Sequence, residues 1–217
     1  MNWLLALAFG YLLGSIPFGL ILTRLFGAGD IRDIGSGNIG ATNVLRTGRK
    51  GLAAATLLLD AAKGFAAVWF ASLIWADGDN PLLCWLIAGA GALIGHCFPV
   101  WLRFKGGKGV ATMLGISFAL DWRIGLASAV VWLLVTLWMR ISSLGGMASA
   151  VASPLAAFAI YATIDPNSGF FSGWMDAVAM LVTGYILLPM ALLVIFQHRA
   201  NIARLRTGAE PKIGQKG

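Results

Sequence analysis

One polar segment in the first quarter of the sequence combines glycine with short hydrogen-bonding side chains and one arginine. It reads Gly35-Ser-Gly-Asn-Ile-Gly-Ala-Thr-Asn-Val-Leu-Arg46. Glycine permits positive φ angles and close approach of the backbone to a ligand, and the planar guanidinium of arginine matches the oxygens of a phosphate. We therefore predict a phosphate-handling site with Ser36 and Arg46 as its leading members. The other candidate ligands in this segment are Gly37, Asn38, Thr42 and Asn43.

A second polar segment reads Phe104-Lys-Gly-Gly-Lys-Gly-Val-Ala-Thr112 and precedes a predicted helix. Glycine-rich backbone at a helix N-terminus exposes N–H groups, and the helix dipole favours an anion there. The spacing differs from that of a nucleotide-binding P-loop and no strand precedes it, so the pattern favours phosphate over ATP. The candidate ligands are Lys105, Gly106, Gly107, Lys108, Gly109 and Thr112.

A third segment, near the C-terminal end, reads His198-Arg-Ala-Asn-Ile-Ala-Arg-Leu-Arg-Thr-Gly-Ala-Glu210. On a continuing helix, positions three and four apart are neighbours. We therefore expect His198 and Asn201 to share one side and to face the other polar segments.

Two charged residues, Asp60 and Lys63, lie inside an apolar segment, three positions apart. A charge at membrane depth costs about 2.5–3.5 kcal/mol on insertion scales, so such residues usually pair inside a bundle. We expect a mutual ion pair that supports the site, with direct substrate contact as the alternative. His96 is expected to be a packed structural donor. The sequence has no carboxylate cluster near the polar segments, so we expect no protein-bound metal and no cofactor.

The composition indicates which elements must position these residues. Of the 217 residues, 59% are hydrophobic and only 12% are charged, with a mean hydropathy of +0.81. Soluble domains are less apolar and about twice as charged, so the excess apolar surface needs lipid. Segments of about 15–25 apolar residues without strand-type alternation predict helices. They are Trp3–Leu25, Leu52–Ala76, Leu82–Leu102, Ile124–Met139, Met147–Ile164 and Ala177–Phe196, with a shorter apolar segment at Val110–Leu120.

The positive charge is gathered in alternate connections between these segments. Fourteen of the sixteen Lys and Arg residues lie in the first, third and fifth connections and in the C-terminal tail. The connections Asp77–Pro81 and Asp165–Asp176 carry acids and no basic residue. The positive-inside rule then places the N-terminus outside and the C-terminus in the cytoplasm. It also accounts for the net charge of +7 better than nucleic-acid binding does.

The number of crossings stays open between seven and five. Val110–Leu120 is short for a hydrocarbon core about 30 Å thick, which needs about 20 helical residues. It either crosses as a short seventh helix or forms, with the following segment, a stretch that dips in and returns. No linker, repeat or low-complexity run divides the chain, so we predict one integral-membrane domain, 1–217, built as an all-α bundle.

With all three segments in order, the chain resembles the PlsY family, the bacterial acyl-phosphate:glycerol-3-phosphate acyltransferases. The resemblance covers S-G-N-x-G-x-T-N-x-x-R from Ser36, K-G-G-K-G-V-A-T from Lys105 and H-x-x-N-I-x-R-L-x-x-G-x-E from His198. It implies seven helices in the bacterial inner membrane, with the site facing the cytoplasm. It also implies transfer of a fatty acyl group to the 1-hydroxyl of glycerol 3-phosphate, giving lysophosphatidic acid and phosphate. The catalytic positions that it implies are Ser36, Arg46, Lys105, His198 and Asn201, with Arg204 and Glu210 as structural support.

The H-x-x-x-x-D motif of acyl-thioester acyltransferases is absent, since Ala203 stands five residues after His198 and Trp101 five after His96. An acyl phosphate has a good leaving group, so we expect catalysis mainly by positioning and charge stabilisation. The proton of the acceptor hydroxyl goes either to His198 or to the donor phosphate. An anion transporter or a lipid-binding scaffold is the alternative from another class. A transporter, however, usually places polar groups near the membrane midplane, whereas these lie on one face.

Overall fold

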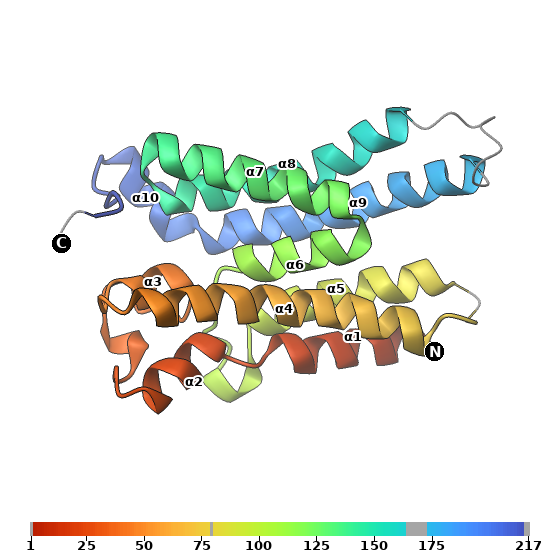
Figure 1. Cartoon of the computed structure of the whole chain (residues 1–217). Coiled ribbons are helices and arrows are strands. Elements are labelled where there is room, and N and C mark those ends of the chain that lie inside the picture. Colours follow the sequence, from red (N-terminus) through yellow and green to blue (C-terminus); the bar gives the residue numbers. More distant parts are fainter. Residues whose placement is uncertain (1, 79, 164–172, 215–217) are drawn as a thin grey trace. The chain divides into compact units, whose positions relative to one another are not determined.

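The computed structural model describes residues 2–78, 80–163 and 173–214, and every regular element in these ranges is helical (Figure 1). This confirms the predicted all-α fold. The chain divides into two compact units, Met1–Ala119 and Leu120–Gly217, which are described separately below. Lys216 and most of the connection 165–176 lie outside the described residues, so their predicted placement stays a prediction.

The first unit contains three long helices and several short ones (Figure 1). The helices are α1 (Asn2–Gly14), α2 (Phe18–Leu25), α3 (Ala41–Leu45), α4 (Lys50–Ile74), α5 (Pro81–Cys97) and α6 (Val110–Leu120), with 3-10 turns η1 (Ile31–Asp33) and η2 (Val100–Leu102). Helices α1, α4 and α5 lie side by side, and α2 and α3 lie at the end away from the N-terminus (Figure 1).

Small residues set the distance between the helices of this unit. A Cβ atom added at Gly10 of α1 would lie 1.9 Å from the carbonyl oxygen of Ala88 in α5. A Cβ added at Gly115 of α6 would lie 1.9 Å from the Ala61 oxygen in α4. Such spacing is impossible for any larger residue and is typical of close helix packing in membranes. Gly10 and Gly115 therefore allow α1 to pack closely on α5 and α6 on α4.

The segment predicted as one helix, Trp3–Leu25, is interrupted between α1 and α2. Pro17 lacks the N–H that would continue the helix and disfavours helical geometry at Ile16. The interruption leaves the Ile16 carbonyl oxygen outside the helical ladder, and the Nζ atom of Lys63 donates a hydrogen bond to it at 2.8 Å. A charged side chain of α4 thus provides a hydrogen-bond donor to the backbone at the break between α1 and α2.

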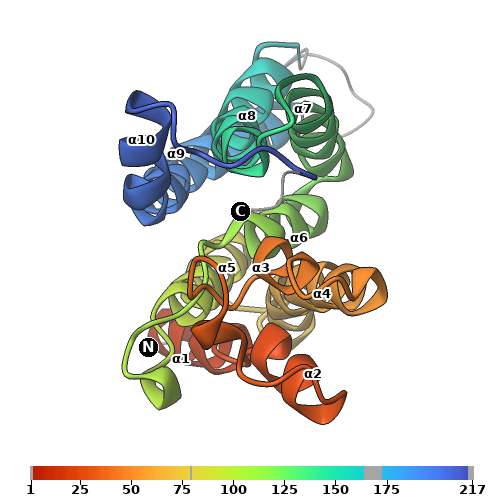
Figure 2. The same ribbon diagram turned by 90° about the vertical axis from the view of Figure 1, so that its left-hand side faces the viewer.

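The second unit is built from three long helices and one short one (Figure 2). They are α7 (Trp122–Met139), α8 (Ser142–Thr163), α9 (Gly173–Gln197) and α10 (Arg199–Arg206). Asp121 caps α7 by accepting a hydrogen bond from the Arg123 backbone N–H at 2.7 Å. Inside the unit, Ser128 of α7 and Ser153 of α8 share a buried hydrogen bond of 2.8 Å between their hydroxyls. Buried hydroxyl pairs of this kind join helices where lipid offers no partner.

Six stretches in the described part of the chain have the length and apolar composition to cross a membrane. They are Asn2–Leu25, Lys50–Ile74, Pro81–Leu102, Trp122–Met139, Ser142–Thr163 and Ala177–Gln197. Helix α6 is apolar but has only 11 residues, and Asp121 separates it from α7. Large apolar side chains are left exposed on these helices, such as Trp138 at 84% exposure, as expected for a surface that meets lipid. The protein is therefore a multi-pass membrane protein.

Candidate active site

The first polar motif is organised around one buried amide. Asn43, in α3, is 2% exposed, and its Nδ2 atom donates hydrogen bonds to the carbonyl oxygens of Ile31, Ile34 and Asn38 at 2.8–2.9 Å. Its Oδ1 atom accepts a hydrogen bond from the Ser36 backbone N–H at 3.2 Å. The Asn43 side chain therefore fastens the loop before α3 from both directions. It shapes the segment that carries the other polar groups.

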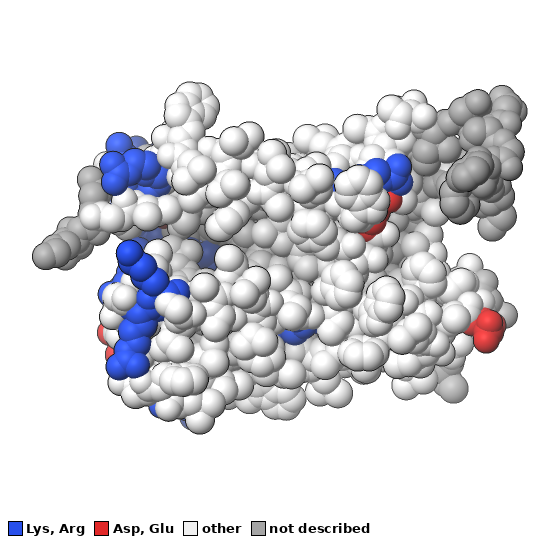
Figure 3. All heavy atoms as spheres, in the orientation of Figure 1, with Lys and Arg blue, Asp and Glu red and all other residues white. Residues whose placement is uncertain are grey.

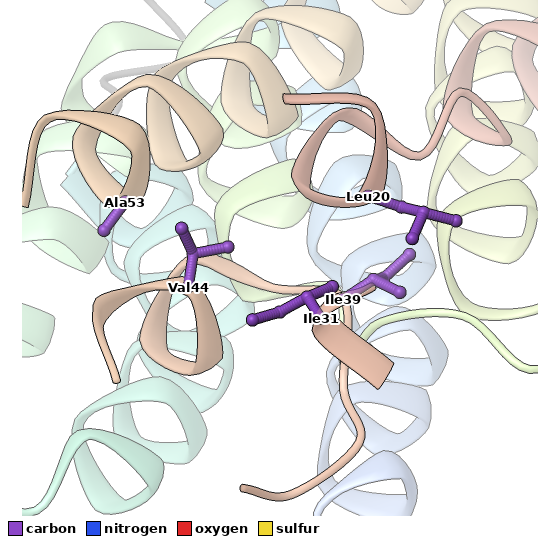
Figure 4. Close-up of a cluster of buried hydrophobic side chains, with 5 residues drawn as sticks. All are labelled: Leu20, Ile31, Ile39, Val44 and Ala53. Carbon is purple, nitrogen blue, oxygen red and sulfur yellow. The ribbon is translucent and has the colours of Figure 1, made fainter. Parts of the chain in front are cut away.

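An apolar cluster lies beneath this loop and fixes it to the helices around it (Figure 4). It comprises Leu20, Ile31, Ile39, Val44 and Ala53, contributed by α2, η1, the loop, α3 and α4. Leu102, which precedes the second motif, packs against the same cluster. The first and second motifs therefore lie at the same end of the first unit.

The guanidinium of Arg46 passes directly over Gly35. Gly35 has φ +56°, and a Cβ atom added there would lie 2.5 Å from Arg46 Nη1 and 2.6 Å from Asn43 Oδ1. Only glycine suits that conformation and that contact. Ser36, Thr42 and Arg46 are exposed on the resulting surface.

The other arginines around this loop are already engaged. Arg24 and Arg32 both pair with Asp30, at 2.7 and 2.5 Å, and the hydrogen bonds from Arg32 lower the pKa of that carboxyl despite partial desolvation. Arg49 donates to the Phe26 carbonyl oxygen. Arg46, in contrast, makes no ion pair or side-chain hydrogen bond with any described residue. Lys and Arg side chains gather over this end of the first unit (Figure 3), and Arg46 remains available for an anion.

The second motif is a glycine segment anchored to the end of α5. The N–H of Gly106 donates to the Cys97 carbonyl oxygen at 3.1 Å, and the N–H of Gly107 donates to that of His96 at 3.0 Å. Gly109 has φ +85°, and its carbonyl oxygen accepts the N–H of Met113 at 2.8 Å, which begins α6. Lys105 is exposed and has no side-chain partner among the described residues. The segment thus offers backbone and one unengaged cation before a helix N-terminus.

The structure places Thr112 differently from the rest of this motif. Its side chain is fully buried in α6, and its carbonyl oxygen lies 2.3 Å from the position of a Cβ added at Gly64 of α4. This burial favours a packing role over phosphate contact. Gly109, Gly107 and Lys108 remain in the segment that precedes the helix.

The predicted ion pair between Asp60 and Lys63 is present. Lys63 Nζ lies 2.8 Å from Asp60 Oδ1, and both side chains are nearly fully buried in α4. His96 Nδ1, at the end of α5, lies 3.7 Å from the same carboxylate oxygen. The described residues contain no group of three or more His, Cys, Asp or Glu suited to a metal ion.

The third motif lies in the second unit, where His198 separates α9 from α10. His198 has φ −92° and ψ 7°, so the expected uninterrupted helix through this motif is wrong at that residue. Its Nδ1 atom contacts the Val194 carbonyl oxygen at 2.7 Å, and the ring is 2% exposed. A carbonyl oxygen can only accept, so in this geometry Nδ1 carries a hydrogen and donates it.

Glu210 holds the motif together by accepting three side-chain hydrogen bonds. Asn201 Nδ2 donates to it at 2.6 Å, Arg204 Nε at 2.7 Å and Ser143 Oγ, from α8, at 2.7 Å. Burial raises the pKa of Glu210, but the three donors outweigh it and the pKa is lowered overall. The tail is fixed further along by the Ile213 N–H, which donates to the Arg140 carbonyl oxygen at 2.7 Å.

Three residues with clear roles in this geometry were not among the predicted site residues. Gly35 leaves room for the Arg46 side chain, and only its position directly before Ser36 in the sequence pointed to a role in the site. Ser143 could not be predicted from a local sequence pattern, because its partner Glu210 lies 67 positions further along the chain. His96 stood out only as a polar residue in an apolar segment.

Comparison with known proteins shows the family of this chain. A family model described as glycerol-3-phosphate acyltransferase matches residues 4–208. A glycerol-3-phosphate acyltransferase of Mesorhizobium japonicum is 54% identical over 99% of this chain and 97% of its own length. One from Zymomonas mobilis is 50% identical over 94% of this chain and 92% of its own length.

Two solved structures of PlsY, an integral membrane glycerol 3-phosphate acyltransferase, are also similar. The glycerol 3-phosphate form has a TM-score of 0.81 and 36% identity, and the lysophosphatidic acid form has 0.79 and 34%. Both comparisons cover 99% of this chain and 96% of the other. The family match, the curated relatives and the all-helical membrane fold lead to one conclusion. The chain belongs to the PlsY family of glycerol-3-phosphate acyltransferases, and it is an acyltransferase.

Proposed function

We propose that the protein transfers a fatty acyl group from an acyl phosphate to the 1-hydroxyl of glycerol 3-phosphate. The products are 1-acyl-glycerol 3-phosphate (lysophosphatidic acid) and inorganic phosphate, the first acylation of bacterial phospholipid synthesis. One observation carries the proposal. Arg46 and Lys105 are exposed and unengaged beside glycine-rich backbone at one end of the first unit, while neighbouring arginines are paired. Both substrates carry a phosphate that these groups would bind.

The chemistry requires little from the protein beyond positioning and charge. The acceptor oxygen forms a bond to the acyl carbonyl carbon, and the bond between that carbon and the phosphate oxygen breaks. Arg46, Lys105 and the N-terminus of α6 would neutralise charge on the substrate phosphates, which is an electrostatic route to rate enhancement. Ser36 would hold a substrate oxygen through its exposed hydroxyl.

The acceptor proton goes either to the departing phosphate or to His198. Because His198 Nδ1 contacts the Val194 carbonyl oxygen, Nε2 is the ring atom that would accept the proton. Asn201 and Glu210 fix the segment that follows His198. Removing a general base typically costs about 10²–10⁴-fold in rate, so full activity with unchanged pH dependence in His198→Gln would assign the proton to the phosphate.

The topology follows the charge distribution. We propose that α6 is a short seventh crossing, that the N-terminus is outside, and that the site faces the cytoplasm from the bacterial inner membrane. Basic connections next to the apolar helices support this orientation. We further propose that both units form one catalytic domain, 1–217, because all three motifs serve the same reaction.

A product assay tests the proposal. Purified protein in detergent receives radiolabelled glycerol 3-phosphate with palmitoyl phosphate, and lipid product and released phosphate are both quantified. We expect the two products in equal amounts, and no product with palmitoyl-CoA in place of the acyl phosphate. Transfer from the thioester at the same rate, or no lipid product from folded protein, would contradict the assignment.

A further inference from the structure

The backbone of the glycine segment is held against the last turn of α5. The N–H groups of Gly106 and Gly107 donate to the carbonyl oxygens of Cys97 and His96. These carbonyls belong to the helix end, where backbone oxygens otherwise lack a partner. The hydrogen bonds fix how far the segment stands from α5. They leave the side of Gly107 open to contact with a side chain.

The ring of His96 occupies that side of Gly107. A Cβ atom added at Gly107 would lie 2.0 Å from His96 Nε2 and 2.6 Å from Cε1. At Gly106 the obstacle is different, because a Cβ there would lie 2.1 Å from the His96 carbonyl oxygen. The side chain of His96 therefore packs against Gly107, whereas only backbone packs against Gly106.

The other edge of the ring faces the buried ion pair. His96 Nδ1 lies 3.7 Å from Asp60 Oδ1, beyond hydrogen-bond length, and forms no hydrogen bond with any described residue. Asp60 is paired with Lys63, and Lys63 is itself anchored to the Ile16 carbonyl oxygen at the break between α1 and α2. The ring is thus enclosed between a fixed charge pair and the glycine backbone.

We propose that His96 is a positioning residue for acyl transfer. Its ring fixes the backbone of Gly107 and so aims the backbone that follows, up to the N-terminus of α6 at Val110, at a substrate phosphate. Asp60 and Lys63 support the ring from behind. The inference rests on the proposed function, which assigns phosphate binding to this segment. It adds the residue that keeps the segment in place.

A double-mutant cycle tests the contact. The methyl group added by Gly107→Ala would clash with the His96 ring. In the double variant with His96→Ala that ring is gone, so the methyl group has room. We expect Gly107→Ala alone to lower kcat/KM by about a hundredfold, because displacements near 1 Å can cost that much. The double variant should regain about tenfold over Gly107→Ala, since contacting residues are not additive. His96→Ala alone should raise the KM for one phosphate substrate more than it lowers kcat.

Gly106→Ala is the matched control. Its methyl group meets a backbone oxygen that no side-chain change at position 96 removes, so His96→Ala should not rescue it. Equal rescue of Gly106→Ala and Gly107→Ala, or no rescue of Gly107→Ala, would overturn the proposal. A fall in kcat without any change in either KM would do the same.

Folding is checked by gel filtration and thermal unfolding in detergent. If His96→Ala does not fold, His96→Asn replaces it, because it keeps a polar group toward Asp60 and still vacates the Nε2 position. Failure of both variants to fold would assign the ring to bundle stability and overturn the positioning role. Wild-type protein without acyl transfer would instead refute the proposed function, which keeps the two failures distinct.

Discussion

Replacing Asn43 with aspartate exchanges its side-chain NH2 group for an oxygen and so removes the hydrogen-bond donor at the centre of the first motif. The Nδ2 atom of Asn43 donates to three carbonyl oxygens, and Oδ1 accepts from the Ser36 N–H. An ionised aspartate has no donor, so its second oxygen would face those carbonyl oxygens. The two hydrogens of Nδ2 are shared among the three carbonyl oxygens, so the four contacts amount to about three hydrogen bonds. Each contributes about 1 kcal/mol net, so about 2 kcal/mol is lost with the two donors.

This loss falls on the loop that positions Ser36 and Arg46. A loss of about 2 kcal/mol in positioning corresponds to about a 30-fold fall in kcat/KM. We expect that fall for glycerol 3-phosphate in Asn43→Asp, with a small change in the midpoint of thermal unfolding. The assay is initial-rate kinetics with palmitoyl phosphate as donor.

Thr47→Val is the matched control, because the two hydrogen bonds of the Thr47 hydroxyl are local. It donates to the Val44 carbonyl oxygen at 2.7 Å and accepts from the Arg49 N–H at 3.4 Å. This variant should keep kcat/KM within about twofold, in line with the small effect of most surface substitutions. If Asn43→Asp retained kcat/KM within about threefold, the loop would not depend on this amide, and the reasoning from its hydrogen bonds would be refuted.

Three further predictions concern the supports of the site. Gly35→Ala should lower kcat by at least about tenfold, since the added methyl strikes Arg46 and strains a positive φ; unchanged kinetics would contradict the contact. Glu210→Gln should lower the midpoint of thermal unfolding at neutral pH. The pKa of Glu210 is lowered from 4.5, so the stability that the ionised carboxylate contributes is present above pH 4.5 and is lost as pH falls through the folded-state pKa. A difference in unfolding midpoint between wild type and Glu210→Gln that grows as the pH is lowered would contradict this. Lys63→Met should destabilise by about 3–5 kcal/mol, because Asp60 is then buried without its partner, and the double variant with Asp60→Asn should recover part of this; equal stability of both would argue against the pair.

The sequence was sufficient for the class of fold and for most of the helix boundaries. Long apolar segments allow few alternatives in lipid, because backbone groups must find partners within the segment. The main departure is the first segment, where Pro17 divides a stretch that hydropathy alone reads as one helix. A hydropathy average over the segment hides a single proline, but the missing N–H of that proline still interrupts the helix.

The site was predictable as a set of motifs but not as a set of roles. Asn43 and Arg46 carry similar signals in the sequence, yet Asn43 is buried and engaged while Arg46 is exposed and unengaged. That difference depends on which carbonyl oxygens surround each side chain, and no local pattern records it. The contact between Ser143 and Glu210 is of the same kind, since it joins residues far apart in the chain.

The central claim is that Arg46 binds substrate phosphate while its paired neighbour Arg24 does not. The direct measurement is the rate of lysophosphatidic acid formation from palmitoyl phosphate by wild type, Arg46→Gln and Arg24→Gln. Charged hydrogen bonds to phosphate contribute about 1.5–3 kcal/mol, so Arg46→Gln should lose about ten- to a hundredfold in kcat/KM. Arg24→Gln loses only an exposed ion pair and should stay within about threefold. Equal losses in both variants would contradict the account.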